Sequence, residues 1–283
     1  MLAQAANRIK AINSVLARPF VATAEKFRLQ GKEANSAGSA ARFVAEFTRS
    51  RRDIMRAQRL RYRIFSEEYG ASMKAPFGLD RDRFDKHCLH LVVRDTQTGE
   101  LVGYTRVLTD RASVSAGGFY SANEFDLTML SRLPGRMAEI GRTCIHPAHR
   151  GGAVITVLWS RLARFMIEER IDYLLGCASV ALSEGYDVAT IVNRIQERHL
   201  SEPEQRVMPR LPLSRLSAND QGSERMPALL KAYLRMGAKV CGEPCWDPDF
   251  NCIDFFILLS VNDLPPRYVQ HFLQPSTPVM QAV

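Results

Sequence analysis

Apolar and polar positions along this chain predict a succession of strands and helices. Runs that suit strands fall at 42–49, 88–94, 101–109, 136–145, 173–180, 238–243 and 252–260. Apolar residues at helical spacing predict helices at 52–68, 153–170, 185–199 and 226–236. Residues 95–100 predict a hairpin turn, and the Gly- and Ser-containing segment 110–135 is predicted to be a long loop. Because strands lead and helices intervene, we expect an α/β sandwich around a mixed sheet.

The first 41 residues have a pattern of their own. Between positions 2 and 27, apolar residues recur at helical spacing among basic residues, with one interruption at Pro19. A cationic, modestly apolar helix is typical of a membrane interface, although the same helix could equally pack on the domain. We predict an amphipathic interfacial segment at 1–30, a linker rich in Ala, Ser and Gly at 31–41, a folded domain at 42–275 and a tail at 276–283.

Positive charge gathers at the N-terminal end of the chain. Residues 1–63 contain 14 Lys and Arg against 4 Asp and Glu, whereas residues 64–283 contain 24 against 26, so the net charge of +8 comes from the first quarter. An acidic partner would therefore meet this end. The lack of a helix-turn-helix or zinc-finger pattern favours an anionic membrane face or an acidic carrier protein over nucleic acid. A merely solvated basic face is the alternative.

Length and composition predict one large domain in a reducing compartment. The 283 residues are 46% hydrophobic, enough for a full core. No apolar run approaches the ~18–20 residues that span a bilayer, and the N-terminus has no signal-peptide core. The six cysteines form no C-x-x-C pair, which favours buried thiols in the cytoplasm over a disulfide or zinc framework. We expect neither a bound metal nor a cofactor.

Charged side chains in apolar surroundings are the first sign of chemistry. Arg61 lies on the apolar face of helix 52–68, where a guanidinium needs an anionic partner, and Asp82 and Asp85 are candidates. Glu139 and Arg142 form a second acid–base pair at strand spacing. The other face of the helix carries a basic stripe, namely Arg52, Arg56, Arg59 and Arg63. Charged residues at these otherwise apolar positions predict either one structural salt-bridge network or a functional site.

The order of these residues resembles a known family. The chain has Arg-x-x-x-Phe on its first domain helix, then Asp-x-x-Asp, a strand with Gly-x-x-Arg, and Glu-x-x-Arg. This order resembles the acyl-homoserine lactone synthases, a branch of the GNAT-type acyltransferases. The longer match, over roughly 42–273, is to the L-ornithine N-alpha-acyltransferases that make lyso-ornithine lipid. The resemblance implies a GNAT-like three-layer sandwich with a mixed central sheet, preceded by the amphipathic helix.

The resemblance implies an acyltransferase that moves a (3-hydroxy)acyl group from acyl carrier protein to the α-amine of L-ornithine. The enzyme would be cytoplasmic and peripheral on the inner face of the membrane. It implies a catalytic pair, Glu139 and Arg142, with Glu139 as base or water-orienting group. It implies acceptor-binding residues, namely Arg61, Phe65, Asp82, Asp85 and Arg106. It implies a loop for the donor's phosphopantetheine, namely Ile145, Arg150, Gly151 and Gly152.

Several alternatives follow from the same residues. Ile155 stands where acetyl-CoA users usually have glycine, which favours the single phosphodiester of a carrier protein over the pyrophosphate of CoA. Glu139 would look the same if it were a structural partner of Arg142. Aromatic and aliphatic residues of 119–130, with Trp159 and Phe165, could line an acyl channel or form ordinary core. Another acceptor such as glutamine or lysine, an acyl-homoserine lactone synthase, and a noncatalytic membrane-associated module are the competing functions.

Overall fold

The computed structural model describes residues 42–69, 75–182, 185–213 and 225–265. All of the described helices and strands belong to one unit, Phe43–Val283. Its main sheet has the order β1-β2-β3-β5-β6-β10-β8, with β9 paired to β10. These strands are β1 (Phe43–Thr48), β2 (Leu89–Asp95), β3 (Leu101–Thr109), β5 (Met137–Ile145), β6 (Tyr173–Ala181), β8 (Lys239–Val240), β9 (Cys245–Asp247) and β10 (Cys252–Ser260). The predicted mixed sheet is confirmed.

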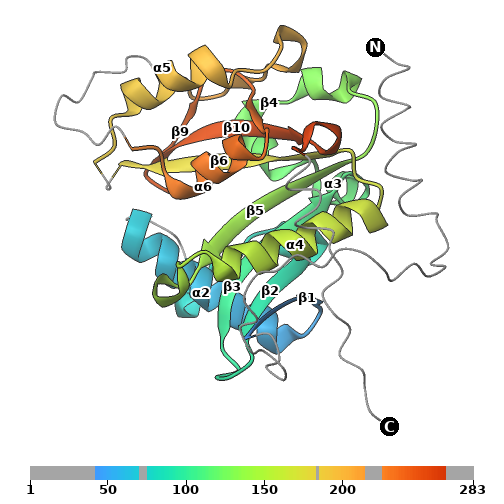
Figure 1. The fold of residues 1–283 in the computed structure, drawn as a ribbon, viewed down its shortest axis with the longest axis vertical. Helices are drawn as coiled ribbons and strands as arrows, with labels where there is room; N and C mark the ends of the chain where they lie inside the picture. The colour runs from blue at the N-terminus through green and yellow to red at the C-terminus, as the bar shows by residue number, and fades with distance from the viewer. Residues whose placement is uncertain (1–41, 70–74, 183–184, 214–224, 266–283) are drawn as a thin grey trace, which may run out of the picture. The chain divides into compact units, whose positions relative to one another are not determined.

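The sheet opens between its two central strands. The pair β5–β6 is parallel, whereas the other described pairs of the main sheet are antiparallel. Parallel pairing covers only Met137–Glu139 of β5, although both strands continue well beyond it and diverge (Figure 1). At the start of this divergence a Cβ on Gly176 would lie 2.5 Å from the carbonyl oxygen of Ile140, so only glycine fits. The divergence leaves side chains of both strands facing an open wedge.

Helices cover both faces of the sheet, as the three-layer prediction requires. Helix α2 (Arg51–Tyr69) begins after Ser50, whose Oγ accepts a hydrogen bond from the amide of Asp53 at 3.4 Å. Helix α4 (Ala153–Glu168) covers the opposite face. Strand β2 shows the division, because Leu91 and Val93 belong to the core cluster under α4, whereas the intervening Val92 packs with α2. Helix α5 is Val188–Arg198, and helix α6 is Ala228–Arg235.

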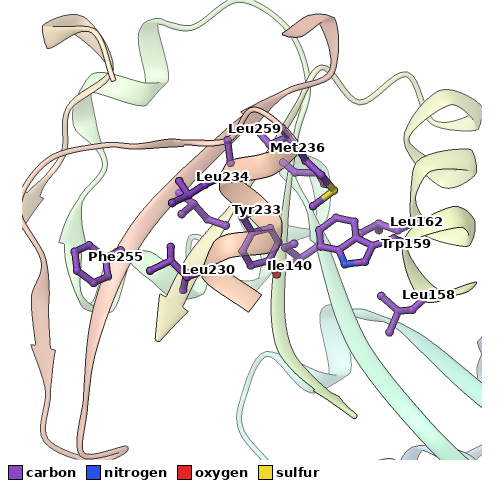
Figure 2. Packing of buried hydrophobic residues seen from close by; sticks show 14 of the residues in the cluster. Ile140, Leu158, Trp159, Leu162, Leu230, Tyr233, Leu234, Met236, Phe255 and Leu259 are labelled. Atoms are coloured by element: carbon purple, nitrogen blue, oxygen red, sulfur yellow. The ribbon is translucent and has the colours of Figure 1, made fainter. Parts of the chain in front are cut away.

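Helix α6 packs beside α4 and forms a wall of the wedge. The rings of Trp159 on α4 and Tyr233 on α6 meet edge to face with centroids 5.2 Å apart (Figure 2). Ile140 of β5 and Leu230 of α6 belong to the same buried cluster (Figure 2). Trp159 and Phe165 are therefore part of the hydrophobic core, which was one of the two roles considered for them.

The segment 110–135 is not the loop that its composition predicts. It contains helix α3 (Asp110–Ala116), strand β4 (Phe125–Asp126) and two short 3₁₀ helices, and β4 pairs with β7 (Met208–Pro209). Thr109 caps α3 by accepting from the amide of Ala112, and Gly117 ends it at φ 80°. Phe125 and Leu130 are buried against β6 and β10. Local caps and long-range burial thus order a segment whose small residues predicted a loop.

Other predictions have mixed outcomes. The six cysteines all lie in the described part of the chain, where none is joined in a disulfide, and four of them are buried. Among the described helices, none has the length and apolar character needed to cross a bilayer. The predicted segments 1–30, 31–41 and 276–283 lie outside the described residues.

Candidate active site

A β-bulge brings Glu139 and Arg142 to the same side of β5. Residues three apart in a regular strand point to opposite faces. Here Tyr104 of β3 pairs with Cys144 and Arg106 pairs with Gly141, so Arg142 and Thr143 together oppose a single β3 residue. Arg142 has φ 55°, a left-handed conformation that is uncommon outside glycine. As a result, both side chains of the predicted catalytic pair line one cavity.

Behind Arg142 lies a network of three arginines and three aspartates. Arg61 donates from Nε to Asp80 at 2.8 Å and from Nη1 to Asp85 at 2.9 Å. Two further arginines complete the network. Arg106 binds Asp82 and Asp85 with contacts of 2.7 Å, and Arg142 reaches Asp80 at 3.2 Å and Asp82 at 3.4 Å.

Burial makes this network strongly coupled. Arg61 has no exposed surface and Arg106 is 3% exposed, so their charges must be neutralised inside the protein. Burial alone would raise the pKa of Asp85, but the charges of Arg61 and Arg106 outweigh it and hold that pKa at about 2. The pKa of Asp82 is lowered in the same way against the effect of burial, chiefly by Arg106. Equal numbers of opposite charges therefore form a rigid neutral block.

Arg142 connects this block to the cavity. Its guanidinium lies 4.5 Å from the ring centre of Phe250 and 4.8 Å from that of Tyr120, so aromatic rings contact it in addition to the carboxylates. Phe65, predicted as an acceptor-binding residue, packs edge to face on Phe250 at 5.7 Å. These contacts fix the guanidinium while leaving part of it in the cavity wall.

Glu139 is held by the segment that follows α3, not by Arg142. Its carboxylate accepts hydrogen bonds from the amide of Tyr120 at 2.5 Å, from the amide of Ser121 at 2.8 Å and from the hydroxyl of Ser121. Burial raises the pKa of Glu139, although the hydrogen bonds from Ser121 and Tyr120 oppose the increase. A buried carboxyl with a raised pKa that lines a cavity is suited to proton transfer.

The cavity in the wedge, which we call the acidic cavity, has a volume of about 80 Å³. Arg142 is the only cationic side chain among the described residues that line it. Its walls also carry four carboxyl side chains, namely Glu124, Glu139, Asp247 and Asp254. The side-chain ligand atoms of Glu124, Cys177 and Asp254 lie within 4.8 Å of one another, a spacing that would also suit a metal ion.

A second cavity of about 350 Å³, which we call the α4 cavity, lies at the N-terminus of α4. It is lined by the predicted donor residues Ile145, Arg150 and Gly152, and by Ile155. Gly152 has φ 98° immediately before α4, with Gly151 beside it in the turn. First-turn amides of a helix have no intrahelical acceptor and favour anions. The two cavities share four wall residues and therefore adjoin, namely Phe65, Thr143, Ser179 and Leu229.

Three of the four arginines of the basic stripe line a groove of about 520 Å³, which we call the basic groove. They are Arg56, Arg59 and Arg63, and His146 lines the same groove. The groove and the α4 cavity are neighbours, because Ile145 lines the cavity while the next residue lines the groove. Arg59 and Arg63 are exposed, and Arg56 is 3.6 Å from Asp53. Positive charge is therefore concentrated beside the mouth of the α4 cavity.

Six of the eleven predicted site residues line the acidic cavity or the α4 cavity, and Gly151 lies in the turn beside Gly152. Arg61, Asp82, Asp85 and Arg106 line neither the acidic cavity nor the α4 cavity among the described residues, and they reach the former through Arg142. Sequence reasoning missed Asp80, which lies two residues before Asp82 in the same segment. It also missed Asp254, although a lone carboxylate in the apolar run of β10 is the same signal that identified Glu139.

Comparisons with known proteins identify the family of this chain. A family model described as an acetyltransferase (GNAT) domain matches residues 60–160. The protein is therefore an N-acyltransferase of GNAT type. An L-ornithine N(alpha)-acyltransferase of Rhodobacter capsulatus is 32% identical over 248 residues, which cover 81% of this chain and 94% of that one. One of Brucella abortus is 32% identical over 79% of this chain and 86% of its own. The chain belongs to this L-ornithine N(alpha)-acyltransferase family.

Solved structures that match most of this chain have much lower sequence identity. FeeM, an N-acyl amino acid synthase from uncultured soil microbes, is 15% identical with a TM-score of 0.49, covering 82% of this chain and 96% of its own. The CoA-dependent acyl-homoserine lactone synthase BjaI is 14% identical with a TM-score of 0.48, covering 82% and 88%.

Proposed function

We propose that this enzyme transfers a (3-hydroxy)acyl group from acyl carrier protein to the α-amine of L-ornithine, giving lyso-ornithine lipid. L-Ornithine is the acceptor in the names of the curated relatives. The observation that carries the proposal is the junction of two cavities, where Glu139 and Arg142 face one cavity and the α4 N-terminus faces the other. An amine in the acidic cavity would thus meet a thioester in the α4 cavity.

The chemistry needs no covalent enzyme intermediate. The α-ammonium loses a proton towards Glu139, the free amine attacks the thioester carbon, and the tetrahedral intermediate expels the thiolate. A C–N bond forms and the C–S bond breaks. The thiolate takes up one proton, and a second proton passes to solvent. Arg142 would bind the acceptor's carboxylate, because a guanidinium pairs well with a carboxylate. The buried network behind it would hold this guanidinium in place.

The choice of carrier protein as donor rests on the basic groove and on Ile155. Acyl carrier protein is acidic and its arm has a single phosphodiester, which the α4 N-terminus and Arg150 suit. The groove beside the α4 cavity would bind the carrier while its arm enters the cavity. The functional test is an assay with purified enzyme, L-ornithine and matched acyl-carrier and acyl-CoA donors, with mass spectrometry of the product. Equal kcat/KM for the two donors would refute the donor assignment.

Charge reversal in the basic groove should weaken the use of the carrier. Arg56→Glu with Arg59→Glu is expected to raise KM for acyl carrier protein by about tenfold or more at low ionic strength, with a smaller effect at high salt. KM for a short acyl-CoA should change far less. Arg132→Glu, an exposed reversal that lines none of these cavities, is the control. An unchanged KM for the carrier would leave the stripe as a solvated face, and release from vesicles would indicate lipid as its partner.

We also propose that the enzyme is cytoplasmic and rests on the inner face of the membrane through residues 1–30. Five Lys and Arg against one Glu in this segment suit an anionic leaflet, where each nearby cation contributes about 1 kcal/mol. Deleting 1–30 should sharply reduce sedimentation with anionic vesicles, while acyl transfer to ornithine in solution persists. Unfolding or aggregation of the truncated chain would instead identify the segment as part of the core.

A further inference from the structure

Three carboxyl side chains of the acidic cavity have no part in the chemistry described above. Glu124 follows the 3₁₀ helix Tyr120–Asn123, Asp247 ends β9, and Asp254 lies within β10. They are 8%, 8% and 3% exposed. All three line the cavity beside Arg142 and Glu139. We call them the acid cluster.

The backbone places these side chains firmly. The amide of Glu124 donates to the carbonyl of Ser121 at 3.1 Å, and its own carbonyl accepts from Arg210 at 2.7 Å. Ser179 donates to Asp254 at 2.6 Å. The carboxylate of Asp247 accepts from the amides of Asp249 and Phe250 at 2.9 and 3.1 Å. The acid cluster is therefore a preorganised feature of the fold.

One oxygen of the cluster lacks a donor. No described donor lies within hydrogen-bond distance of the buried Oε2 atom of Glu124, whose neighbour is the carboxyl of Asp254. A buried polar atom without a partner is costly, so native proteins rarely keep one unless a ligand or another function requires it. This carboxyl, more than nine-tenths buried, lines the cavity wall within 4.8 Å of Asp254 and Cys177. The geometry therefore points to a hydrogen-bond donor that enters the cavity.

Four carboxyl side chains against one arginine in the cavity wall favour a cation as this donor. Burial and the neighbouring Asp254 raise the pKa of Glu124 well above its usual range, and burial also raises the pKa of Asp254 and of Asp247. Arg142, the cation of the cavity wall, is already paired with Asp80 and Asp82. Like charges held together in a buried site are relieved by a proton or by an incoming cation.

We propose that the acid cluster of Glu124, Asp247 and Asp254 binds the side-chain ammonium of the acceptor and thereby selects a basic amino acid. This inference rests on the proposed function, since it assigns the recognition of that acceptor to particular residues. Arg142 would hold the carboxylate, the acid cluster would hold the distal ammonium, and the α-amine would be left to attack. A neutral side chain such as that of glutamine or norvaline would leave the buried carboxyls without the cation and bind poorly.

The substitutions that test this are Glu124→Gln and Asp254→Asn. Glutamine has the shape of protonated glutamate, so the thermal midpoint of Glu124→Gln should stay within a few degrees of wild type. Its kcat/KM for L-ornithine should fall on the order of 10²-fold, since hydrogen bonds between charged groups are strong. Its kcat/KM for L-norvaline, which has the same three side-chain carbons without the amine, should stay the same or rise. Asp126→Asn, an exposed change two residues from Glu124, is the control.

The outcomes separate this inference from the proposed function. If the wild-type enzyme acylates ornithine and the variants keep its preference for ornithine over norvaline, the proposed role of the acid cluster fails while the proposed function stands. Wild-type enzyme that acylates only neutral amino acids would overturn the proposed function and, with it, the cluster's role. If Zn²⁺ shifts the thermal midpoint of wild type but not of Glu124→Gln, and ornithine does not, the cluster is a metal site and the inference fails.

Discussion

Replacing Glu139 by glutamine is expected to lower kcat by on the order of 10²-fold or more. The carboxylate lines the acidic cavity, and burial raises its pKa, so it is a stronger base towards the attacking ammonium than an exposed glutamate. The glutamine side chain retains an acceptor oxygen for Ser121 but cannot remove the proton. Because the base must be ionised, wild-type kcat should rise with pH through the raised pKa of Glu139, and this limb should disappear in the variant.

A matched variant separates catalysis from anchoring. The side-chain NH₂ of glutamine would face the backbone N–H groups that donate to Glu139. Two donors cannot pair, so we expect a loss of stability of about 1–3 kcal/mol. Ser121→Ala removes the hydroxyl donor while it keeps the carboxylate. That hydrogen bond lowers the pKa of Glu139, so Ser121→Ala should move the pH profile to higher pH with kcat restored at its plateau. Near-normal turnover by a folded Glu139→Gln enzyme would remove Glu139 from the mechanism.

Much of the fold could be predicted because its elements are locally consistent. Hydrophobic periodicity predicted α2, α4 and the five long strands β2, β3, β5, β6 and β10 to within a few residues. It failed at 110–135, where Gly and Ser predicted a loop. There the order depends on a cap at Thr109 and on burial of Phe125 against Phe256 of a strand far along the chain, which local composition does not reveal.

Several residues of the candidate site could be identified from the sequence, but their arrangement could not. A buried Arg61 followed from helical periodicity, and the structure confirms that it has no exposed surface. The sequence pairs Glu139 with Arg142, but in a regular strand they would point to opposite faces. The bulge that turns both to one cavity depends on pairing with β3, which the sequence does not show. Strand periodicity would have drawn attention to Asp254, had a lone acid in an apolar strand been weighed as it was for Glu139. Glu124 lies in an irregular segment, where no period applies.

Replacing Arg61 by methionine is expected to lower the free energy of unfolding by about 3–5 kcal/mol. Methionine fills much of the same space, but Asp80 and Asp85 each lose a direct contact with a guanidinium. Removing one partner of a buried ion pair leaves an uncompensated charge, and total stabilities are only about 5–15 kcal/mol. Arg59→Met, on the exposed face of the same helix, should change stability by less than about 0.5 kcal/mol. Urea denaturation of both variants gives the comparison.

The pH dependence identifies the network as the cause. The pKa of Asp85 is held at about 2 in the folded protein, below its value of about 3.9 in an unfolded chain. The unfolded state therefore binds the proton first as the pH falls. The stabilisation, about 2 kcal/mol for this group, is present above pH ~4 and is lost between pH ~4 and ~2. Arg61→Met raises the pKa of Asp85, so the acid-sensitive loss in this window should shrink relative to wild type. Parallel stability curves for Arg61→Met and wild type across this window would show that the pair does not hold Asp85 ionised.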